Sequence, residues 1–352
     1  MTDAAAAFRL TVLNPGGRDP EQHFPDGAGV PGIGHPPTNF HGYAACTHGS
    51  FHRDVGSAIA ADAPVLLLLR GDFREAERAL SRLQSAGIPV AVSLKETGLH
   101  QIANQLRDTR KLARFISLVR AADGCLGATP EAAEFYRTIR GNDGRVAFIA
   151  TPYPTAEDAW NFSIPTAERT GLFLGTREFG VPSRNHLAAL SLARELGETT
   201  GEFVTVYNFD GRRGQRLLDA LGFASNKLRV LNRQLEYSDY LRAIATHRIV
   251  LQLDTSFVPG QVAGDAALAR VPCVGGNGAI DRLAFPELSG YGRAMSEVGT
   301  AAKQLLTDDD FYLRQVELLA QPATSVISFE RIAEALRQFF GGLIQAKAIA
   351  SK

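Results

Sequence analysis

A glycine-led segment in the second half of the chain has the residue types of a phosphate site. Gly260-Gln261-Val262 stand just before a helix that we expect to begin near Gly264. Backbone N–H groups at a helix N-terminus bind phosphate oxygens, and a glycine lets the phosphate approach the backbone closely. The same residues would equally make a tight turn between a strand and a helix. The segment therefore predicts a diphosphate site, with a plain turn as the alternative.

A segment near the N-terminus, residues 15–56, is rich in Gly and Pro and holds five of the eight histidines: His23, His35, His41, His48 and His52. His48 and His52 have the spacing of two metal ligands on one helix, but their Gly- and Pro-rich flanks do not predict a helix. We therefore expect no metal site. The segment is interpreted as a loop with one catalytic or binding histidine, His41 or His48, or as a set of structural and surface histidines.

Charged and polar residues also follow an expected buried strand at residues 89–93. They are Lys95, Glu96 and His100. Ligands of open α/β sheets bind at the carboxyl ends of the strands, so these residues are candidates for a cleft. Glu96 is the candidate acid or base. The alternative is a helix cap with a glutamate in the first turn.

Short apolar runs alternate with amphipathic stretches along most of the chain, which is typical of βαβ units and parallel sheets covered on both faces. In the first half, the pattern predicts strands at residues 9–13, 63–69, 89–93, 124–128 and 145–150, and helices near 72–86, 100–120 and 130–139. In the second half, it predicts strands at 171–174, 202–207, 227–231, 249–253 and 271–274, and helices near 185–196, 214–221, 237–246 and 264–269.

Residues 151–169 contain three prolines and few aliphatic side chains, a composition typical of a linker. The alternation starts afresh after this segment, so we expect two doubly wound α/β domains. A last helix is expected over residues 329–350, with one apolar face made by residues 332, 333, 336, 339, 340, 343 and 344. That face must pack on another part of the chain.

The composition excludes several classes of protein. The 37 basic and 37 acidic residues give 352 residues a net charge of zero, so no nucleic-acid partner is expected. Three scattered cysteines without a CxxC pair disfavour a disulfide framework and a cysteine zinc site. We expect no transmembrane segment, because the longest aliphatic run, residues 65–69, is too short, and no signal peptide. The sequence therefore predicts a cytoplasmic protein of bacterial type.

The second half resembles the carboxy-terminal domain of GT-B glycosyltransferases, in particular the large retaining family that uses nucleotide-sugar donors. The resemblance is carried by residues 235–241, the strand at 249–253, the turn and helix at 254–267, and Arg270-Val271-Pro272-Cys273-Val274-Gly275-Gly276. In the first half, residues 122–129 and 146–154 are similar to two strands of the same family. The resemblance implies two Rossmann-like domains facing a central cleft: 1–155 on the acceptor side, 156–328 for the nucleotide sugar, and a final helix, 329–352, that crosses back to the first domain.

The resemblance also implies roles for single residues. Asp265 stands where the family has a glutamate that binds the ribose hydroxyls, whereas Phe257 stands where it has a second acidic residue. Asp254 is either a substitute for that residue or, equally, a cap of the strand end. Arg177 and Arg184 would neutralise the diphosphate. The donor-binding residues predicted on this basis are Gly16, Gly17, Arg177, Arg184, Tyr207, Asn232, Asp254, Ser256, Gly260, Gln261, Val262 and Asp265. For Tyr207 a place in the buried core is an equal alternative, for Arg184 a solvated loop, and for Asp265 a helix N-terminal position.

The predicted function is transfer of a sugar from a nucleotide-sugar donor to an unidentified acceptor, without a cofactor and without a metal. The family resemblance favours retention of the anomeric configuration, with Arg177 stabilising the departing diphosphate. The phenylalanine at position 257 leaves open an inverting route in which His41, His48 or Glu96 is the base. Two other functions stay open: a non-catalytic GT-B-like binding or scaffold protein, and a sugar-nucleotide epimerase or hydrolase. The sequence leaves the oligomeric state open.

Overall fold

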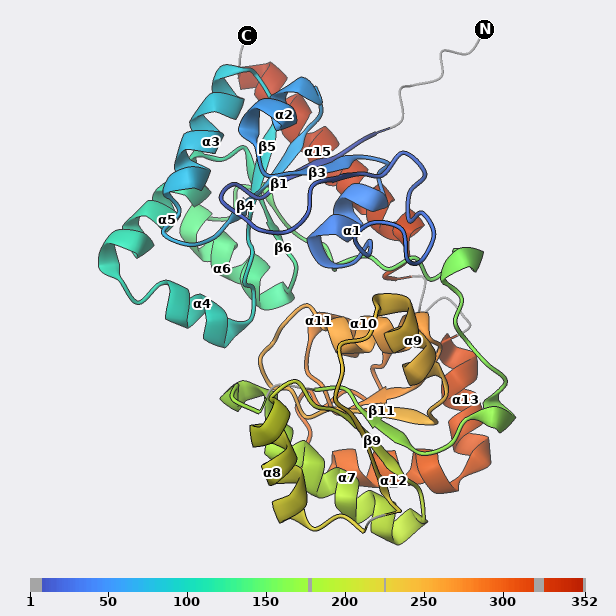
Figure 1. Cartoon of the computed structure of the whole chain (residues 1–352). Helices are drawn as coiled ribbons and strands as arrows, with labels where there is room; N and C mark the ends of the chain where they lie inside the picture. Colours follow the sequence, from blue (N-terminus) through green and yellow to red (C-terminus); the bar gives the residue numbers. More distant parts are fainter. Residues whose placement is uncertain (1–7, 177–178, 225, 320–325, 351–352) are drawn as a thin grey trace, which may run out of the picture. The chain divides into compact units, whose positions relative to one another are not determined.

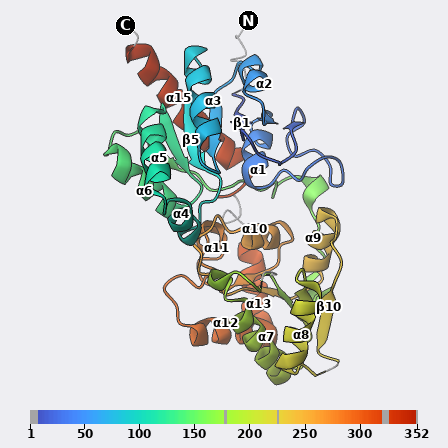
Figure 2. The same ribbon diagram turned by 60° about the vertical axis from the view of Figure 1, so that its left-hand side comes forward.

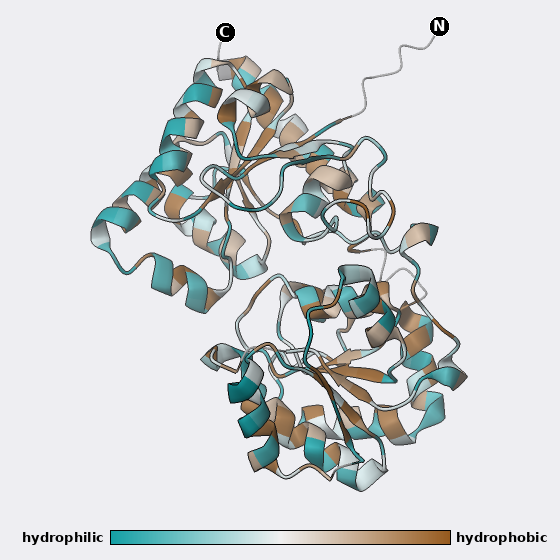
Figure 3. Cartoon of the chain, viewed as in Figure 1, coloured by the Kyte–Doolittle hydropathy of each residue, from teal (hydrophilic) through white to brown (hydrophobic). Residues whose placement is uncertain are grey.

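The computed structural model describes residues 8–176, 179–224, 226–319 and 326–350. By its internal contacts the chain divides into two units: unit 1 is Met1–Pro154 with Ser328–Lys352, and unit 2 is Thr155–Ile327. Each unit is built around one sheet, whose strands are the brown, hydrophobic elements in Figure 3, with teal, hydrophilic residues on the outer helix faces.

Unit 1 contains a seven-stranded sheet in the order β2-β3-β1-β4-β5-β6-β7. All neighbouring strands are parallel except β2, which is antiparallel to β3. The strands are β1 (Thr11–Leu13), β2 (Gln22–His23), β3 (Ser50–His52), β4 (Val65–Leu69), β5 (Val90–Leu94), β6 (Gly124–Gly127) and β7 (Val146–Phe148). The helices are α1 (Asn39–Ala45), α2 (Val55–Ala60), α3 (Arg74–Ser85), α4 (Leu99–Gln105), α5 (Thr109–Ala121), α6 (Pro130–Arg140) and α15 (Phe329–Ala350).

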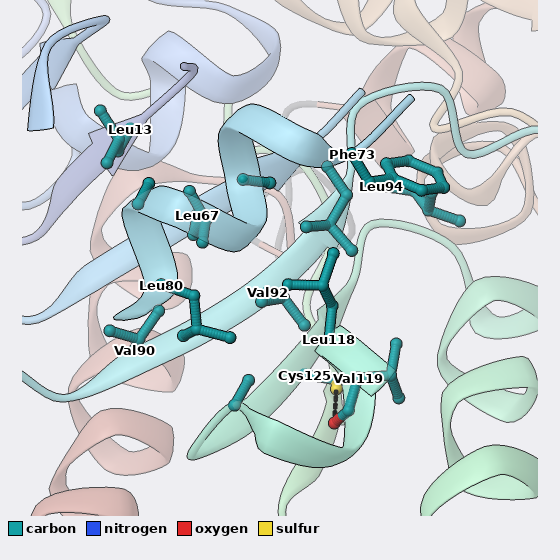
Figure 4. Close-up of a cluster of buried hydrophobic side chains, with 14 of the residues drawn as sticks. Leu13, Leu67, Phe73, Leu80, Val90, Val92, Leu94, Leu118, Val119 and Cys125 are labelled. Carbon is teal, nitrogen blue, oxygen red and sulfur yellow. Dashed lines mark hydrogen bonds between the residues drawn. The ribbon is translucent and has the colours of Figure 1, made fainter. Parts of the chain in front are cut away.

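Both faces of the unit 1 sheet are covered. On one face, alternate residues of β4 and β5 pack against α2, α3 and α5 in a buried cluster, part of which Figure 4 shows around Val92 and Leu118. Gly124 points to the opposite face, where an added Cβ would lie 2.8 Å from Leu343 Cδ1 of α15. Helix α15, red in Figures 1 and 2, therefore covers that face and belongs to unit 1 although it ends the described chain.

Unit 2 contains a five-stranded parallel sheet in the order β10-β9-β8-β11-β12. Figure 1 shows α7 and α12 on one face of it and α9 and α10 on the other. Its strands are β8 (Leu172–Leu174), β9 (Val204–Tyr207), β10 (Leu228–Leu231), β11 (Ile249–Leu251) and β12 (Cys273–Val274). Its helices are α7 (His186–Thr200), α8 (Gly211–Leu221), α9 (Tyr237–Ala245), α10 (Gln261–Leu268), α11 (Ala279–Ala284), α12 (Met295–Thr307) and α13 (Asp309–Leu319).

Some expected elements need correction. The single helix expected near residues 100–120 is two helices, α4 and α5, because Asp108 accepts the Lys111 N–H (2.8 Å) and starts a new helix. The segment at 15–56, expected to be a loop, holds β2, α1, β3 and the start of α2. These elements are short, and α1 is buried on nearly all sides, so it lacks the amphipathic period that would have predicted it.

Candidate functional site

The N-terminus of α10 lies at the carboxyl end of β11, and its position differs from the expected one. The helix begins at Gln261 rather than near Gly264, whose N–H already donates to the Gly260 carbonyl (2.9 Å) inside the helix. Gly260 is the cap residue, with a φ of +97° that a residue with a side chain rarely adopts. The N–H groups of Gln261 and Val262 thus belong to the first turn, whose N–H groups the helix itself does not use.

Arg184 and Asp254 meet beside the same strand end. They form an ion pair in which the Asp254 side chain is buried and the Arg184 side chain is about one quarter exposed (3% and 24%). The other oxygen of Asp254 accepts the Ser256 N–H at 2.7 Å, and the Ser256 hydroxyl bonds the Ser183 hydroxyl at 2.7 Å. Three predicted donor residues are therefore adjacent, and the Arg184 guanidinium is held on the loop that leads from β11 into α10.

Arg177 lies outside the described residues, so its predicted role stays a prediction. The described residue that precedes it in the chain is Thr176. That threonine bonds Nδ1 of His186 at 2.6 Å. His186, which the sequence analysis did not select, is buried, and burial lowers its pKa to about 4.

Asp265 lies in the second turn of α10 and is buried. Its Oδ1 accepts a hydrogen bond of 2.6 Å from the hydroxyl of Tyr237, the first residue of α9. The helix N-terminal alternative is wrong, because α10 starts four residues earlier. Tyr237 is a polar neighbour that sequence reasoning missed; its place at the start of an expected helix was the only available signal.

Tyr207 and Asn232, two of the predicted donor-binding residues, differ in their surroundings. Tyr207 is a core residue, 2% exposed, whose hydroxyl accepts the Leu235 N–H at 2.6 Å. Asn232 is exposed, and its Oδ1 accepts a hydrogen bond from Nδ2 of Asn208 (2.9 Å). The core alternative for Tyr207 is therefore confirmed, and Asn208 and Asn232 join the loops after β9 and β10.

Phe257 occupies the place of the expected acidic residue and has a left-handed backbone with a φ of +52°. Its N–H donates to Oδ1 of Asn277 (3.0 Å), which holds this backbone in place. The Arg282 guanidinium lies 5.8 Å from the centre of its ring. A cation and an aromatic ring thus stand where the resembled family has a carboxylate.

In unit 1, the loops after β1 and β5 are joined by polar contacts. A Cβ at Gly17 would lie 2.3 Å from Nδ2 of Asn14, so the Asn14 side chain requires a glycine there, whereas Gly16 has a φ of +68°. The same Nδ2 donates to Asp19 (2.7 Å), which pairs with Lys95 Nζ at 2.8 Å. Burial works against ionisation of Asp19, but the Lys95 ammonium outweighs it, and the pKa of Asp19 is lowered.

The candidate histidines of unit 1 are held by carbonyl groups. His41 is buried in α1, stacked between the rings of His35 (4.0 Å) and Phe51 (3.7 Å), and Nε2 donates to the Pro20 carbonyl at 2.8 Å. Burial lowers its pKa to about 4, so the ring is neutral at pH 7 with its lone pair on Nδ1. His48 is exposed, and its Nδ1 bonds a backbone carbonyl at 2.9 Å.

Glu96 is exposed, and its carboxylate accepts a hydrogen bond of 2.7 Å from Gln101 in the first turn of α4. The alternative of a helix cap with a glutamate in the first turn is wrong, because the cap residue of α4 is Gly98 and its first turn contains no acidic residue. The catalytic roles of Glu96 and His48 stay predictions. Within the described ranges, no three His, Cys, Asp or Glu side chains are grouped so that they could hold a metal ion. No helix among those residues is long and apolar enough to cross a membrane.

Comparison of the fold with solved structures finds several that match over nearly their full length. HepE of Anabaena in complex with UDP is 11% identical, with 95% of this chain and 100% of that chain covered and a TM-score of 0.63. Sucrose-phosphate synthase of Thermosynechococcus elongatus is 12% identical, with coverage of 96% and 100% and a TM-score of 0.62. A UDP-forming α,α-trehalose-phosphate synthase of Burkholderia xenovorans is 10% identical, with coverage of 96% and 99% and a TM-score of 0.60.

The chain has the GT-B fold. At identities of 10–12% the likeness shows the fold and leaves activity to be argued from the site. No protein-family model matches the sequence, and no curated protein does. The expected fold class, two doubly wound α/β domains of GT-B type with the last helix returned to the first, is confirmed.

Proposed function

We propose that this protein is a glycosyltransferase that takes its sugar from a nucleotide-sugar donor bound by unit 2. The observation that carries the proposal is the glycine-capped start of α10, together with Arg184, which Asp254 holds on the loop that leads from β11 into α10. Helix N-termini and guanidinium groups are the two protein groups best suited to a diphosphate. The GT-B fold supports this assignment, since HepE, which has a similar fold, was solved with UDP and with UDP-glucose.

The proposed chemistry is the stabilisation of a departing diphosphate. As the bond between the sugar and the diphosphate breaks, negative charge grows on the phosphate oxygens, and the first-turn N–H groups of α10 and the Arg184 guanidinium would neutralise it. These groups make a metal ion unnecessary in the proposal. Retention of configuration and an acceptor bound by unit 1 are proposed on the family resemblance, with Asn14, Asp19 and Lys95 as the joined polar groups of that unit.

The proposal is tested by titrating UDP, GDP, ADP and uridine into the protein in a calorimeter. We expect one nucleoside diphosphate to bind well and its nucleoside to bind weakly, because the diphosphate supplies the contacts. Arg184→Gln should weaken diphosphate binding by roughly 10- to 100-fold, the size of a lost charged hydrogen bond, and leave the nucleoside unchanged. Arg216→Gln, which removes an exposed cation from α8, is the control. Failure of every nucleotide to bind would refute the donor site.

Donor consumption then separates a transferase from a scaffold protein or a hydrolase. The wild-type protein is incubated with the matching nucleotide sugar, with and without candidate acceptors, and with EDTA. We expect release of the nucleoside diphosphate that accelerates with an acceptor and persists in EDTA. Binding without any turnover would favour the scaffold function, and release that no acceptor accelerates would favour a hydrolase. NMR of the product's anomeric proton reports retention or inversion.

A further inference from the structure

A buried carboxylate lies directly behind the first turn of α10. Asp281 belongs to the first turn of α11 and is 3% exposed. Its Oδ1 accepts a hydrogen bond of 2.7 Å from Nε2 of Gln252, the residue that follows β11. A Cβ built on Gly260 would lie 3.0 Å from its Oδ2. The carboxylate therefore contacts the backbone from which α10 starts.

Two further glycines make room for this carboxylate. A Cβ on Gly276 would lie 2.2 Å from Oδ1 of Asp281, and one on Gly278 would lie 2.7 Å from Oδ2. Both distances are shorter than real Cβ atoms allow, so a side chain at either position would displace the carboxylate. The Asp281 carboxylate is thus packed against three glycines of the loops after β11 and β12, which have no side chain to exclude it.

Backbone hydrogen bonds join the same two loops next to Asp281. The N–H groups of Ala279 and Ile280 donate to the carbonyls of Val258 (2.9 Å) and Pro259 (3.0 Å), which immediately precede Gly260. The first turn of α11 is therefore hydrogen-bonded to the residues that lead into α10. Asp281 and the residues that lead into α10 are therefore in direct contact.

We propose that Asp281 is a positioning residue for the donor diphosphate: it sets the Gly260 turn from which the first N–H groups of α10 bind phosphate, and its ionisation weakens that binding. This inference rests on the proposed function, because it requires a diphosphate at α10. Asp281 itself is buried behind the turn and need not touch the donor.

The surroundings of Asp281 make its charge variable near neutral pH. Burial, and next the carboxylate of Asp254 in the loop after β11, raise the pKa of Asp281 to about 7. The thiol of Cys273 of β12 also lies near Asp281, since its pKa is raised by burial and next by the Asp281 carboxylate. Below pH 7 the carboxyl is neutral. Above pH 7 it adds a negative charge behind α10, which repels a phosphate anion.

The test is calorimetry of UDP and uridine with the wild-type protein and Asp281→Asn at pH 6, 7 and 8; if the matching base is not uracil, that nucleotide and nucleoside replace them. Asparagine has the same shape and still accepts from Gln252, but it carries no charge. Asp239→Asn, an exposed carboxylate of α9 paired with Arg242, is the control. UDP ionises in this range too, so each wild-type affinity is compared with the variant at the same pH.

We expect UDP to bind the wild-type protein and Asp281→Asn equally at pH 6, and the wild-type protein roughly tenfold more weakly at pH 8. Uridine should show no difference. In buffers of different ionisation enthalpy at pH 7.5, UDP binding to the wild-type protein should take up more protons than UDP binding to Asp281→Asn. Asp239→Asn should take up as many protons as the wild-type protein. Asp281→Ala, which also removes the contact with Gly260, should weaken UDP binding at every pH.

Equal pH profiles of UDP binding for the wild-type protein and Asp281→Asn would overturn the role of Asp281 and leave the donor site intact. If Asp281→Asn fails to fold, the proton uptake that accompanies UDP binding to the wild-type protein tests the inference instead. The inference is overturned if this uptake does not exceed the uptake explained by the ionisation of UDP itself. If the wild-type protein binds no nucleoside diphosphate, the proposed function fails and the inference falls with it.

Discussion

Arg184 and Asp254 lie 70 positions apart in the chain and form a partly buried ion pair in unit 2. Removing Arg184 takes this counter-charge away from the buried carboxylate of Asp254, which lowers the free energy of unfolding. We expect Arg184→Met to lower the stability of unit 2 by roughly 3 kcal/mol and Arg184→Met/Asp254→Asn to restore most of that loss. Urea unfolding of the single and double variants measures the coupling. An additive pair of effects would show that the ion pair contributes nothing.

The raised pKa of Asp281 also predicts a pH dependence of stability. The pKa of Asp281 is about 7 in the folded protein, and its ordinary value is 3.8. Between pH 3.8 and pH 7, the carboxyl group is therefore protonated in the folded protein and ionised in the unfolded chain. The free energy of unfolding therefore falls as pH rises through this window, by about 1.4 kcal/mol per pKa unit. Asp281→Asn removes this loss.

We expect the thermal midpoint of Asp281→Asn to exceed that of the wild-type protein at pH 8 and to match or fall below it at pH 4. Scanning calorimetry at the two pH values measures the difference, and Asp239→Asn again serves as the control. A difference that is the same at both pH values would contradict a titrating carboxyl at this position.

At the scale of the element, α15 shows what one amphipathic helix does for unit 1. Ile332, Leu336, Phe340 and Leu343 are buried, and Lys347 pairs with Asp123 at 3.6 Å. Deleting a buried aromatic side chain costs its transfer free energy and leaves a cavity. We expect Phe340→Ala to destabilise unit 1 by roughly 3–5 kcal/mol.

Hydrogen exchange followed by mass spectrometry locates that effect. Protection should fall in the strands of unit 1 and stay unchanged in those of unit 2. Gln338→Ala on the exposed face of α15 is the control and should cost little. Equal loss of protection in both units would show that α15 does not act through unit 1 alone.

At the scale of the whole molecule, the two units are built differently along the chain. Unit 2 is one continuous stretch, Thr155–Ile327, with its own sheet, whereas unit 1 needs residues from both ends. We expect residues 155–327 produced alone to unfold cooperatively and to bind the same nucleoside diphosphate as the full chain. Circular dichroism and calorimetry check this. A fragment without a cooperative transition would show that unit 2 depends on unit 1.

Much of the fold could be predicted because many elements have local signatures. Residues 329–350 repeat apolar side chains at helical spacing, and the helix has these bounds in the structure. The strand β4 is an unbroken aliphatic run, as expected for a strand buried on both faces. The segment 15–56 lacked such signals, since β3 is three residues long and exists because it pairs with β1.

The sequence alone determined the two βαβ arrays, the linker between them and the glycine turn before α10, because these depend on near neighbours in the chain. Only the tertiary structure decided that α10 begins at Gln261 with Gly260 as its cap, that Arg184 meets Asp254, and that Asp281 lies behind the turn with a raised pKa. These features need contacts between residues 20 to 70 positions apart. Burial and charge proximity depend on such contacts, and no local pattern of residues encodes them.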